Sequence, residues 1–313
     1  MAFHKSMAPL MAEVAFWGLL SLVLILATSF VPLLGFIFTP FTPLPLILLF
    51  LRRGIRGWAM GLLLLFLILA LSSSITSGVA YLLEFGAIAL ALGEGIRREW
   101  RGEKTILLGT LVAGVGSILA LFFHILRSPM GLSAWIGEQI AIRLQEVREV
   151  FARAGVPPTS WDALQRFLME TYPALLVLGI LFATVINYYS AGYIQGIGKS
   201  ETAPRIPPFS SWSLPDYWVW GLILSLSLYL IPGPAKGVGL NLLLIFSGLY
   251  LLQGMAISSF LLRRWHLSSP LRIVIFFLLI AQPFLILLLV ILGLLDVWLN
   301  LRKIGDPLRT AGG

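Results

Sequence analysis

The sequence predicts an all-α integral membrane protein that folds as a polytopic helical bundle. Of the 313 residues, 58% are hydrophobic and only 12% are charged, whereas a soluble domain is about one quarter charged. Several windows exceed the roughly 20 apolar residues that a helix needs to cross about 30 Å of hydrocarbon. These windows do not alternate polar and apolar residues as the strands of an outer-membrane barrel do. The bundle should therefore contain about eight or nine transmembrane helices.

The apolar spans fall into two groups around one polar interval. Residues 1–126 hold about five spans, residues 171–300 hold about four, and residues 301–313 form a polar tail. The second span carries three prolines, among them Pro43 and Pro45, and an interior proline removes a helix hydrogen bond. We expect a broken or partly unwound helix there. The candidate spans cover residues 10–30, 33–51, 57–71, 75–96, 105–126, 173–194, 217–231, 240–262 and 271–295.

The distribution of charge indicates the orientation of the chain. The formal net charge is +8, but the Lys and Arg residues form short clusters between spans, as the positive-inside rule requires. We therefore expect contact with the lipid bilayer and no nucleic acid partner. The amino terminus and the clusters around Arg53 and Arg98 should lie on the cytoplasmic side of a bacterial inner membrane. Nine crossings would place Arg302 and Lys303 outside, against this rule, so eight and nine spans both stay open.

The polar interval, residues 127–170, contains an amphipathic pattern. Its five arginines and five acidic residues balance, so no net charge retains it in the cytoplasm. Ile140, Leu144 and Val147 recur at intervals of four and three residues, as on one face of a helix. A glycine and two prolines within residues 155–158 then end this helix before another begins. The pattern predicts an extracytoplasmic helical hairpin, which is either an interfacial connector or a lid over a site.

No catalytic constellation is present in the sequence. His4, His124 and His266 each stand alone, without a carboxylate at metal-ligand spacing, and the chain has no cysteine. Neither a G-x-S-x-G turn nor a phosphate-binding glycine loop occurs. We therefore expect neither an enzyme nor a bound metal or other cofactor.

Polar side chains within the spans are the candidate binding residues. Glu84 lies about halfway along its span and nearly 20 Å from Arg97, at about 1.5 Å per residue, so the two cannot pair. An ionised carboxylate at the bilayer centre costs about 2.5–3.5 kcal/mol, so Glu84 is either a neutral structural residue or a substrate or proton site. Glu94 can instead pair with Arg97 and Arg98. Each buried amide is either interhelical glue or a ligand contact. The predicted substrate-binding residues are Pro43, Tyr81, Glu84, Asn187, Asn241 and Gln253.

Four stretches of the chain resemble a known family in their order and spacing. The stretches "TPFTPLPLILLFLRRGIRG", "PPFSSWSLPDYW", "LNLLLIFSGLYLLQGMAISSFLL" and "LDVWLNLRK" are similar to the YybS-like family of bacterial polytopic membrane proteins, over nearly the whole chain. The resemblance implies no reaction, and Glu84 lies outside its pattern. The amino-terminal half is also distantly similar to the substrate-binding subunits of energy-coupling-factor transporters and to the rod-shape protein MreD. Residues matching the family pattern include Arg53, Gly54, Trp212, Pro215, Gln253, Asp296 and Arg302.

Polar groups at membrane depth without a catalytic constellation favour a small-molecule binding or transport component. The site would lie near the proline-broken span, Glu84, Asn187 and Asn241, and the partners would be other membrane proteins. The alternative is a scaffold or assembly protein of the cell envelope, whose working surfaces would be "RRGIRGW", "PPFSSWSLPDYW" or the extracytoplasmic hairpin. A membrane enzyme acting on lipid is the third hypothesis. Asp296 is expected to cap the segment after the last span rather than to bind a ligand.

Overall fold

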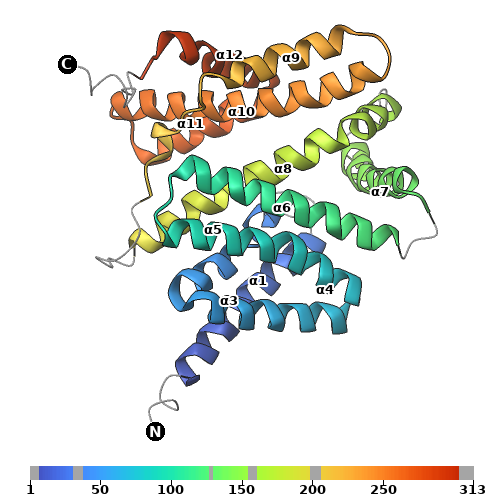
Figure 1. The fold of residues 1–313 in the computed structure, drawn as a ribbon, viewed down its shortest axis with the longest axis vertical. Coiled ribbons are helices and arrows are strands. Elements are labelled where there is room, and N and C mark those ends of the chain that lie inside the picture. The colour runs from blue at the N-terminus through green and yellow to red at the C-terminus, as the bar shows by residue number, and fades with distance from the viewer. Residues whose placement is uncertain (1–6, 31–37, 127–129, 154–160, 198–205, 303–313) are drawn as a thin grey trace. The chain divides into compact units, whose positions relative to one another are not determined.

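The regular structure of the protein is entirely helical wherever the chain is described. The computed structural model describes residues 7–30, 38–126, 130–153, 161–197 and 206–302 (Figure 1). Helices account for all regular elements in these ranges, so the predicted all-α class is confirmed. Large apolar side chains remain exposed along many of the helices, as lipid-facing surfaces require.

Six helical segments are long and apolar enough to cross a membrane in the described part of the chain. Helices α11 (Ser269–Ala281) and α12 (Pro283–Leu299) form a seventh candidate only as a pair bent by 103°. Helix α9 (Trp218–Leu230) has 13 residues and spans only about 20 Å. The predicted count of eight or nine spans is therefore not confirmed. The six segments are Ala8–Ala27, Thr39–Ser72, Ile75–Arg97, Gly102–Ile125, Trp161–Gly196 and Pro234–Arg264.

The helices form two compact units, which are described separately. The first unit comprises residues 1–172 and 179–206, and the second comprises residues 173–178 and 207–313. Helix α8 (Trp161–Ile197) contributes to both, because its residues 173–178 pack with the second unit.

In the first unit, helix α3 (Leu44–Ser72) turns back on itself at Gly54. Gly54 has φ 67° and ψ −161°, a conformation that only glycine adopts without strain. The chain reverses there so sharply that a Cβ atom on Gly61 would lie 2.7 Å from Leu49 Cδ2 and 3.1 Å from Leu46 Cδ2. Residues 44–53 and 55–72 are therefore two arms packed against each other, although they read as one apolar segment.

The prolines of this region begin a helix instead of breaking its interior. Pro43 occupies the N-cap position of α3 and Pro45 lies in its first turn, where the missing N–H has no intrahelical partner to lose. A short 3-10 turn, η1 (Thr39–Phe41), precedes them. The predicted interruption thus lies before Leu44, and Gly54 rather than a proline makes the reversal.

The remaining long helices of the first unit include one irregular turn. Helix α1 (Met7–Phe30) packs on α3. Helices α4 (Ile75–Tyr81) and α5 (Ala87–Arg97) are joined by a π-helical turn, η2 (Leu82–Gly86), into one continuous span. Helix α6 (Gly102–Ile125) runs back along this span and contacts it through Gly95, next to Thr105, and through Gly116, next to the Leu83 carbonyl.

The polar interval folds as helix α7 (Leu132–Arg153) followed by the start of α8. The Arg148 guanidinium lies 5.3 Å from the centre of the Trp161 ring, and Gly137 lies beside Met169. The second predicted helix of the hairpin is not separate, because it is the first part of the 37-residue helix α8, which continues into the next span. An independent extracytoplasmic hairpin is therefore not confirmed.

The second unit is built around helix α10 (Pro234–Arg264). Helix α9 runs antiparallel to it, since Gly239 meets Tyr229 and Gly221 meets Phe246. On another side α12 crosses α10 where Gly254 meets the Leu289 carbonyl. Glycines at these contacts allow helix backbones to approach closely, as is common in membrane bundles.

Candidate functional site

The six predicted binding residues occupy three separate places. Tyr81 and Glu84 belong to the span that contains the π-helical turn. Pro43 and Asn187 lie near the beginning of α3, whereas Asn241 and Gln253 lie within the second unit. Within the first unit, no hydrogen bond, ion pair or ring contact between described residues joins Tyr81 or Glu84 to Pro43 or Asn187.

Glu84 is an unpaired carboxyl in the interior of a span. Its side chain is half-buried and makes no hydrogen bond or ion pair with any residue that the structure describes. The phenol of Tyr172 lies within electrostatic range of this carboxyl. Tyr81, by contrast, is 4% exposed and packs its ring 5.3 Å from that of Phe85. The Tyr81 hydroxyl is buried without a hydrogen-bond partner among the described residues, so Glu84 differs from Tyr81 in being the more exposed of the two and in carrying a carboxyl.

The π-helical turn sets the position of Glu84. A π turn holds one more residue than an α turn, so it shifts the side chains before it relative to those after it. Such turns are found frequently at functional sites. Here α6 supports the turn directly, because Gly116 has no side chain to clash with the Leu83 carbonyl. Trp58 supports it from α3 by donating from Nε1 to the Gly86 carbonyl at 3.3 Å.

Asn187 fastens the turn that precedes α3. It is 0% exposed, and its Nδ2 donates to the Pro40 carbonyl at 2.5 Å and to the Ala183 carbonyl at 2.7 Å. Its Oδ1 is buried without a hydrogen-bond partner among the described residues. Pro43 accepts a hydrogen bond from Ile47 N–H at 3.1 Å, which starts α3. Pro43 therefore starts α3 from within the proline-containing segment, and Asn187 holds the preceding turn from α8.

Asn241 accepts a hydrogen bond from a backbone N–H next to the proline inside α8. Pro173 lies inside α8, and a proline disrupts the backbone hydrogen bonds of the helical turn before it. The N–H of Ala174 donates instead to Asn241 Oδ1 at 3.0 Å, while Asn241 Nδ2 donates to the Gly237 carbonyl at 2.9 Å. Of the two roles that the sequence allows for a buried amide, a structural contact between helices or a ligand contact, this geometry favours the structural contact.

Gln253 belongs to a buried polar group that we call the Arg302 cluster: Trp212, Gln253, Asp296 and Arg302. Arg302 Nη2 donates to Asp296 Oδ2 at 2.9 Å, with side chains that are 1% and 7% exposed. Arg302 Nη1 donates to the carbonyls of Ser210 and Trp212 at 3.0 and 2.6 Å. Gln253 Nε2 also donates to Asp296 Oδ2, at 3.1 Å.

Backbone groups supply the remaining partners of Gln253 and Asp296 in the Arg302 cluster, whereas Arg302 Nε and Trp212 Nε1 are buried without a partner among the described residues. Gln253 Oε1 accepts from Leu214 N–H at 3.0 Å, and Asp296 Oδ1 accepts from Leu301 N–H at 2.8 Å. The second bond is the cap expected of Asp296. Since both carboxylate oxygens and both amide atoms already have partners, the cluster ties the chain around residues 210–214 to the end of α12. Its arrangement is that of a structural clasp.

The other family-pattern residues have structural positions. Arg53 forms a two-pronged ion pair with Glu13, with contacts of 2.9 Å from Nε and 2.6 Å from Nη2. Gly54 makes the reversal of α3, and Pro215 accepts from Trp218 N–H at 3.1 Å at the start of α9. The sequence marked these residues individually but did not indicate that the carbonyls of Ser210 and Trp212 would be the partners of Arg302.

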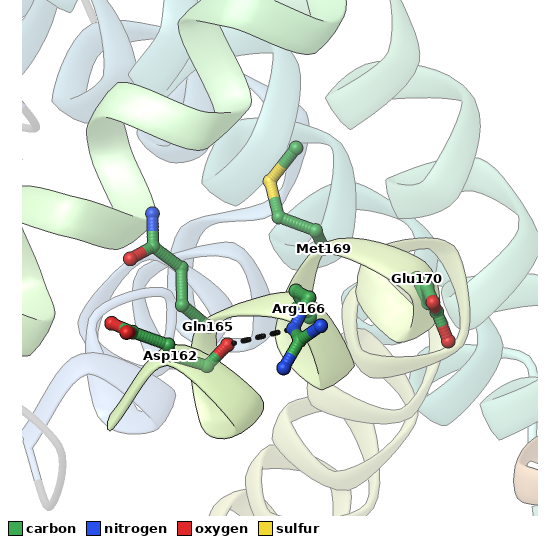
Figure 2. A pocket seen from close by; sticks show the side chains of 5 residues that line it. All are labelled: Asp162, Gln165, Arg166, Met169 and Glu170. Atoms are coloured by element: carbon green, nitrogen blue, oxygen red, sulfur yellow. Dashed lines mark hydrogen bonds between the residues drawn. The ribbon is translucent and has the colours of Figure 1, made fainter. Parts of the chain in front are cut away.

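A surface hollow at the start of α8 contains none of the predicted binding residues. Figure 2 shows its lining, in which Arg166 Nε donates to the Asp162 carbonyl at 3.3 Å. The hollow is open to its surroundings and all of its lining comes from one helix. Among the described residues, no group of three His, Cys, Asp or Glu side chains is placed to hold a metal ion. The hollow is lined by Asp162, Gln165, Arg166, Met169 and Glu170.

Comparison with known proteins places the chain in a family. Searches among curated proteins and among solved structures find no match. A family model described as "Predicted membrane protein (DUF2232)" matches residues 19–297, which include most of both units. The protein is thus a membrane protein with several apolar helices and belongs to the DUF2232 family.

Proposed function

We propose that the protein binds a small molecule within the membrane, as a component of a transport system, and that Glu84 is the binding residue. The observation that carries this proposal is an unpaired carboxyl on a π-helical turn inside a membrane span. Ionisable residues at this depth are rare and expensive, and they commonly mark substrate or ion pathways.

The depth of Glu84 supports the proposal. The span runs from Ile75 to Arg97, so Glu84 lies about 14 Å from one end and about 20 Å from the other. Glu94 provides the contrast on the same helix, because Arg97 and Arg98 both contact it, at 2.9 and 2.5 Å. A carboxyl without such a partner favours a ligand that brings a positive charge or a hydrogen-bond donor.

The exchange of Glu84→Gln is expected to abolish ligand-dependent stabilisation of the protein. A thermal-shift screen of purified protein against amines, vitamins, metal ions and lipid precursors should find a compound that raises the Tm of the natural sequence. A ligand at 100 times its Kd stabilises by about 2.7 kcal/mol, which such a scan detects. Glu94→Gln is the matched control and should respond to the same compound.

Two results would contradict this function. One is a screen in which no compound stabilises the natural sequence, and the other is an equal response of the Glu84→Gln variant. A stoichiometric partner that crosslinks in cells and is lost on deleting Trp135–Glu170 would favour the scaffold alternative instead.

We also propose an orientation, with the amino terminus on the cytoplasmic side of a bacterial inner membrane. The clusters around Arg53 and Arg98 support it by the positive-inside rule. The Arg302 cluster supports a cytoplasmic end of α12, since it holds that end to the chain around Ser210 and Trp212.

Single cysteines will test this orientation cleanly because the chain has none of its own. We expect Arg56→Cys, Ser211→Cys and Leu301→Cys to react with a membrane-impermeant maleimide only after the membrane is permeabilised. Ser73→Cys should react in intact cells. Labelling of Ser211→Cys and Leu301→Cys from opposite sides would refute the common location.

A further inference from the structure

We propose that two arginine-rich turns of the first unit form a binding site for the headgroup of an anionic phospholipid. One turn is the reversal of α3, with Arg52, Arg53 and Arg56, and the other joins α5 to α6. This site is separate from Glu84 and does not depend on the function proposed above. The second turn carries Arg97, Arg98, Arg101 and Lys104.

The two turns lie beside each other in the folded chain. Arg97 Nη1 approaches to 3.9 Å of the position that a Cβ atom on Gly54 would occupy. The same guanidinium lies 5.3 Å from the centre of the Phe50 ring, one turn before the reversal. Cations separated by about 40 residues in sequence therefore share one end of the first unit.

The described acidic side chains near these turns neutralise only part of the charge. Seven cations face four acids at these turns, Glu13, Glu94, Glu99 and Glu103, which leaves a net charge of +3. Glu94 is already shared by two arginines and Glu13 is held by a third. The contact of Glu103 with Arg101 is a long one, at 3.8 Å.

Three exposed cations form no salt bridge or hydrogen bond with an acidic side chain among the described residues: Arg52, Arg56 and Lys104. Arg52 lies within electrostatic range of Glu13, which Arg53 already binds. Arg52 lies over the Trp17 ring at 5.2 Å and Lys104 over the Trp100 ring at 4.6 Å. Arg56 has neither an ion pair nor a ring contact there. These side chains retain their capacity to bind an anion.

The setting identifies the anion as a lipid headgroup. The second turn joins two segments that are each long and apolar enough to cross a membrane, Ile75–Arg97 and Gly102–Ile125, and the first turn lies beside it, so the cations of both lie at the level of the headgroups. Tryptophan rings are enriched at the same level, and they hold Arg52 and Lys104 here. A phosphodiester offers several oxygens to cations spread over two turns, while its acyl chains contact the apolar helices.

The test measures the binding of phosphatidylglycerol to the full chain by native mass spectrometry. Each surface cation contributes about 1 kcal/mol to the attraction of anionic lipid, which is about fivefold in affinity. Arg56→Gln and Lys104→Gln should each weaken binding about fivefold, and the double variant about 25-fold. Phosphatidylcholine should bind weakly to all forms, and Arg56→Lys should retain most of the affinity for phosphatidylglycerol.

Arg166→Gln is the matched control for the loss of one exposed arginine. Arg166 lies about 33 Å along α8 from Tyr188, which contacts the second arginine-rich turn at Gly102. Its removal should leave lipid binding unchanged. Equal binding of phosphatidylcholine, an unchanged affinity in the double variant, or an equal loss in Arg166→Gln would each overturn the proposal.

Discussion

Replacing Arg302 by alanine is expected to lower the free energy of unfolding by about 3–5 kcal/mol, because it leaves the buried carboxylate of Asp296 without its cationic partner. Arg302 is the cationic partner of Asp296 and also satisfies the carbonyls of Ser210 and Trp212. Its removal therefore leaves three buried acceptors short of a donor and releases the chain before α9 from the end of α12. Thermal and denaturant unfolding of the purified protein in detergent will measure the loss.

Matched variants separate the cluster from a general effect of losing charge. Arg264→Ala removes an exposed arginine at the end of α10 and should change stability by less than about 0.5 kcal/mol. Combining Arg302→Ala with Asp296→Asn should cost less than the sum of the two single changes, since the pair is coupled. Additive losses, or an Arg302→Ala variant as stable as Arg264→Ala, would show that the Arg302–Asp296 pair does not stabilise the fold.

Gly254→Ala is expected to destabilise the second unit by about 1–3 kcal/mol or more, through a steric clash between helices. A Cβ atom at this position would overlap the Leu289 carbonyl of α12, which is backbone and cannot rotate away. Gly293 faces the Tyr250 carbonyl in the same crossing, so both helices use glycine at one contact. The shift in Tm on unfolding in detergent gives the magnitude.

Gly237→Ala is the control within the same helix. A Cβ atom on Gly237 would meet nothing within 4 Å, so only helix propensity changes. Alanine is favoured over glycine by about 1 kcal/mol in a helix, and Gly237→Ala should therefore be neutral or stabilising. Equal changes in stability from Gly254→Ala and Gly237→Ala would contradict the steric explanation, in which the close crossing of α10 and α12 limits the size of residue 254.

The helical class and the position of most apolar segments follow from the sequence because both depend on local composition. The length of apolar runs is fixed by the thickness of the hydrocarbon, and the reversal at Gly54 coincides with a cluster of arginines that marked a turn. The prediction of a broken second span depended on prolines, whose effect is also local. Their position at the start of α3, rather than inside it, required knowledge of where the helix begins.

The partners of the buried polar residues could not be predicted in the same way. Asn187 bonds a carbonyl 147 residues away and Asn241 an N–H 67 residues away, and no local pattern encodes those pairings. The family pattern marked Trp212, Asp296 and Arg302 without showing that they meet. Their convergence depends on the packing of α9, α10 and α12, which composition alone leaves undetermined.

The π-helical turn at Leu82–Gly86 also determines how this span responds to the insertion or deletion of a residue. A turn of this kind is what one inserted residue leaves in an otherwise continuous α-helix. Removing one residue from it would give a regular α-helix while α4 and α5 keep their relative orientation, because the π turn absorbs the extra residue locally. Gly78 could then still face Phe66 while Gly93 faces Phe50. A deletion of Glu84 would therefore leave both helix contacts in register, whereas a deletion within the α-helical part of α5 would rotate one contact relative to the other by about 100°.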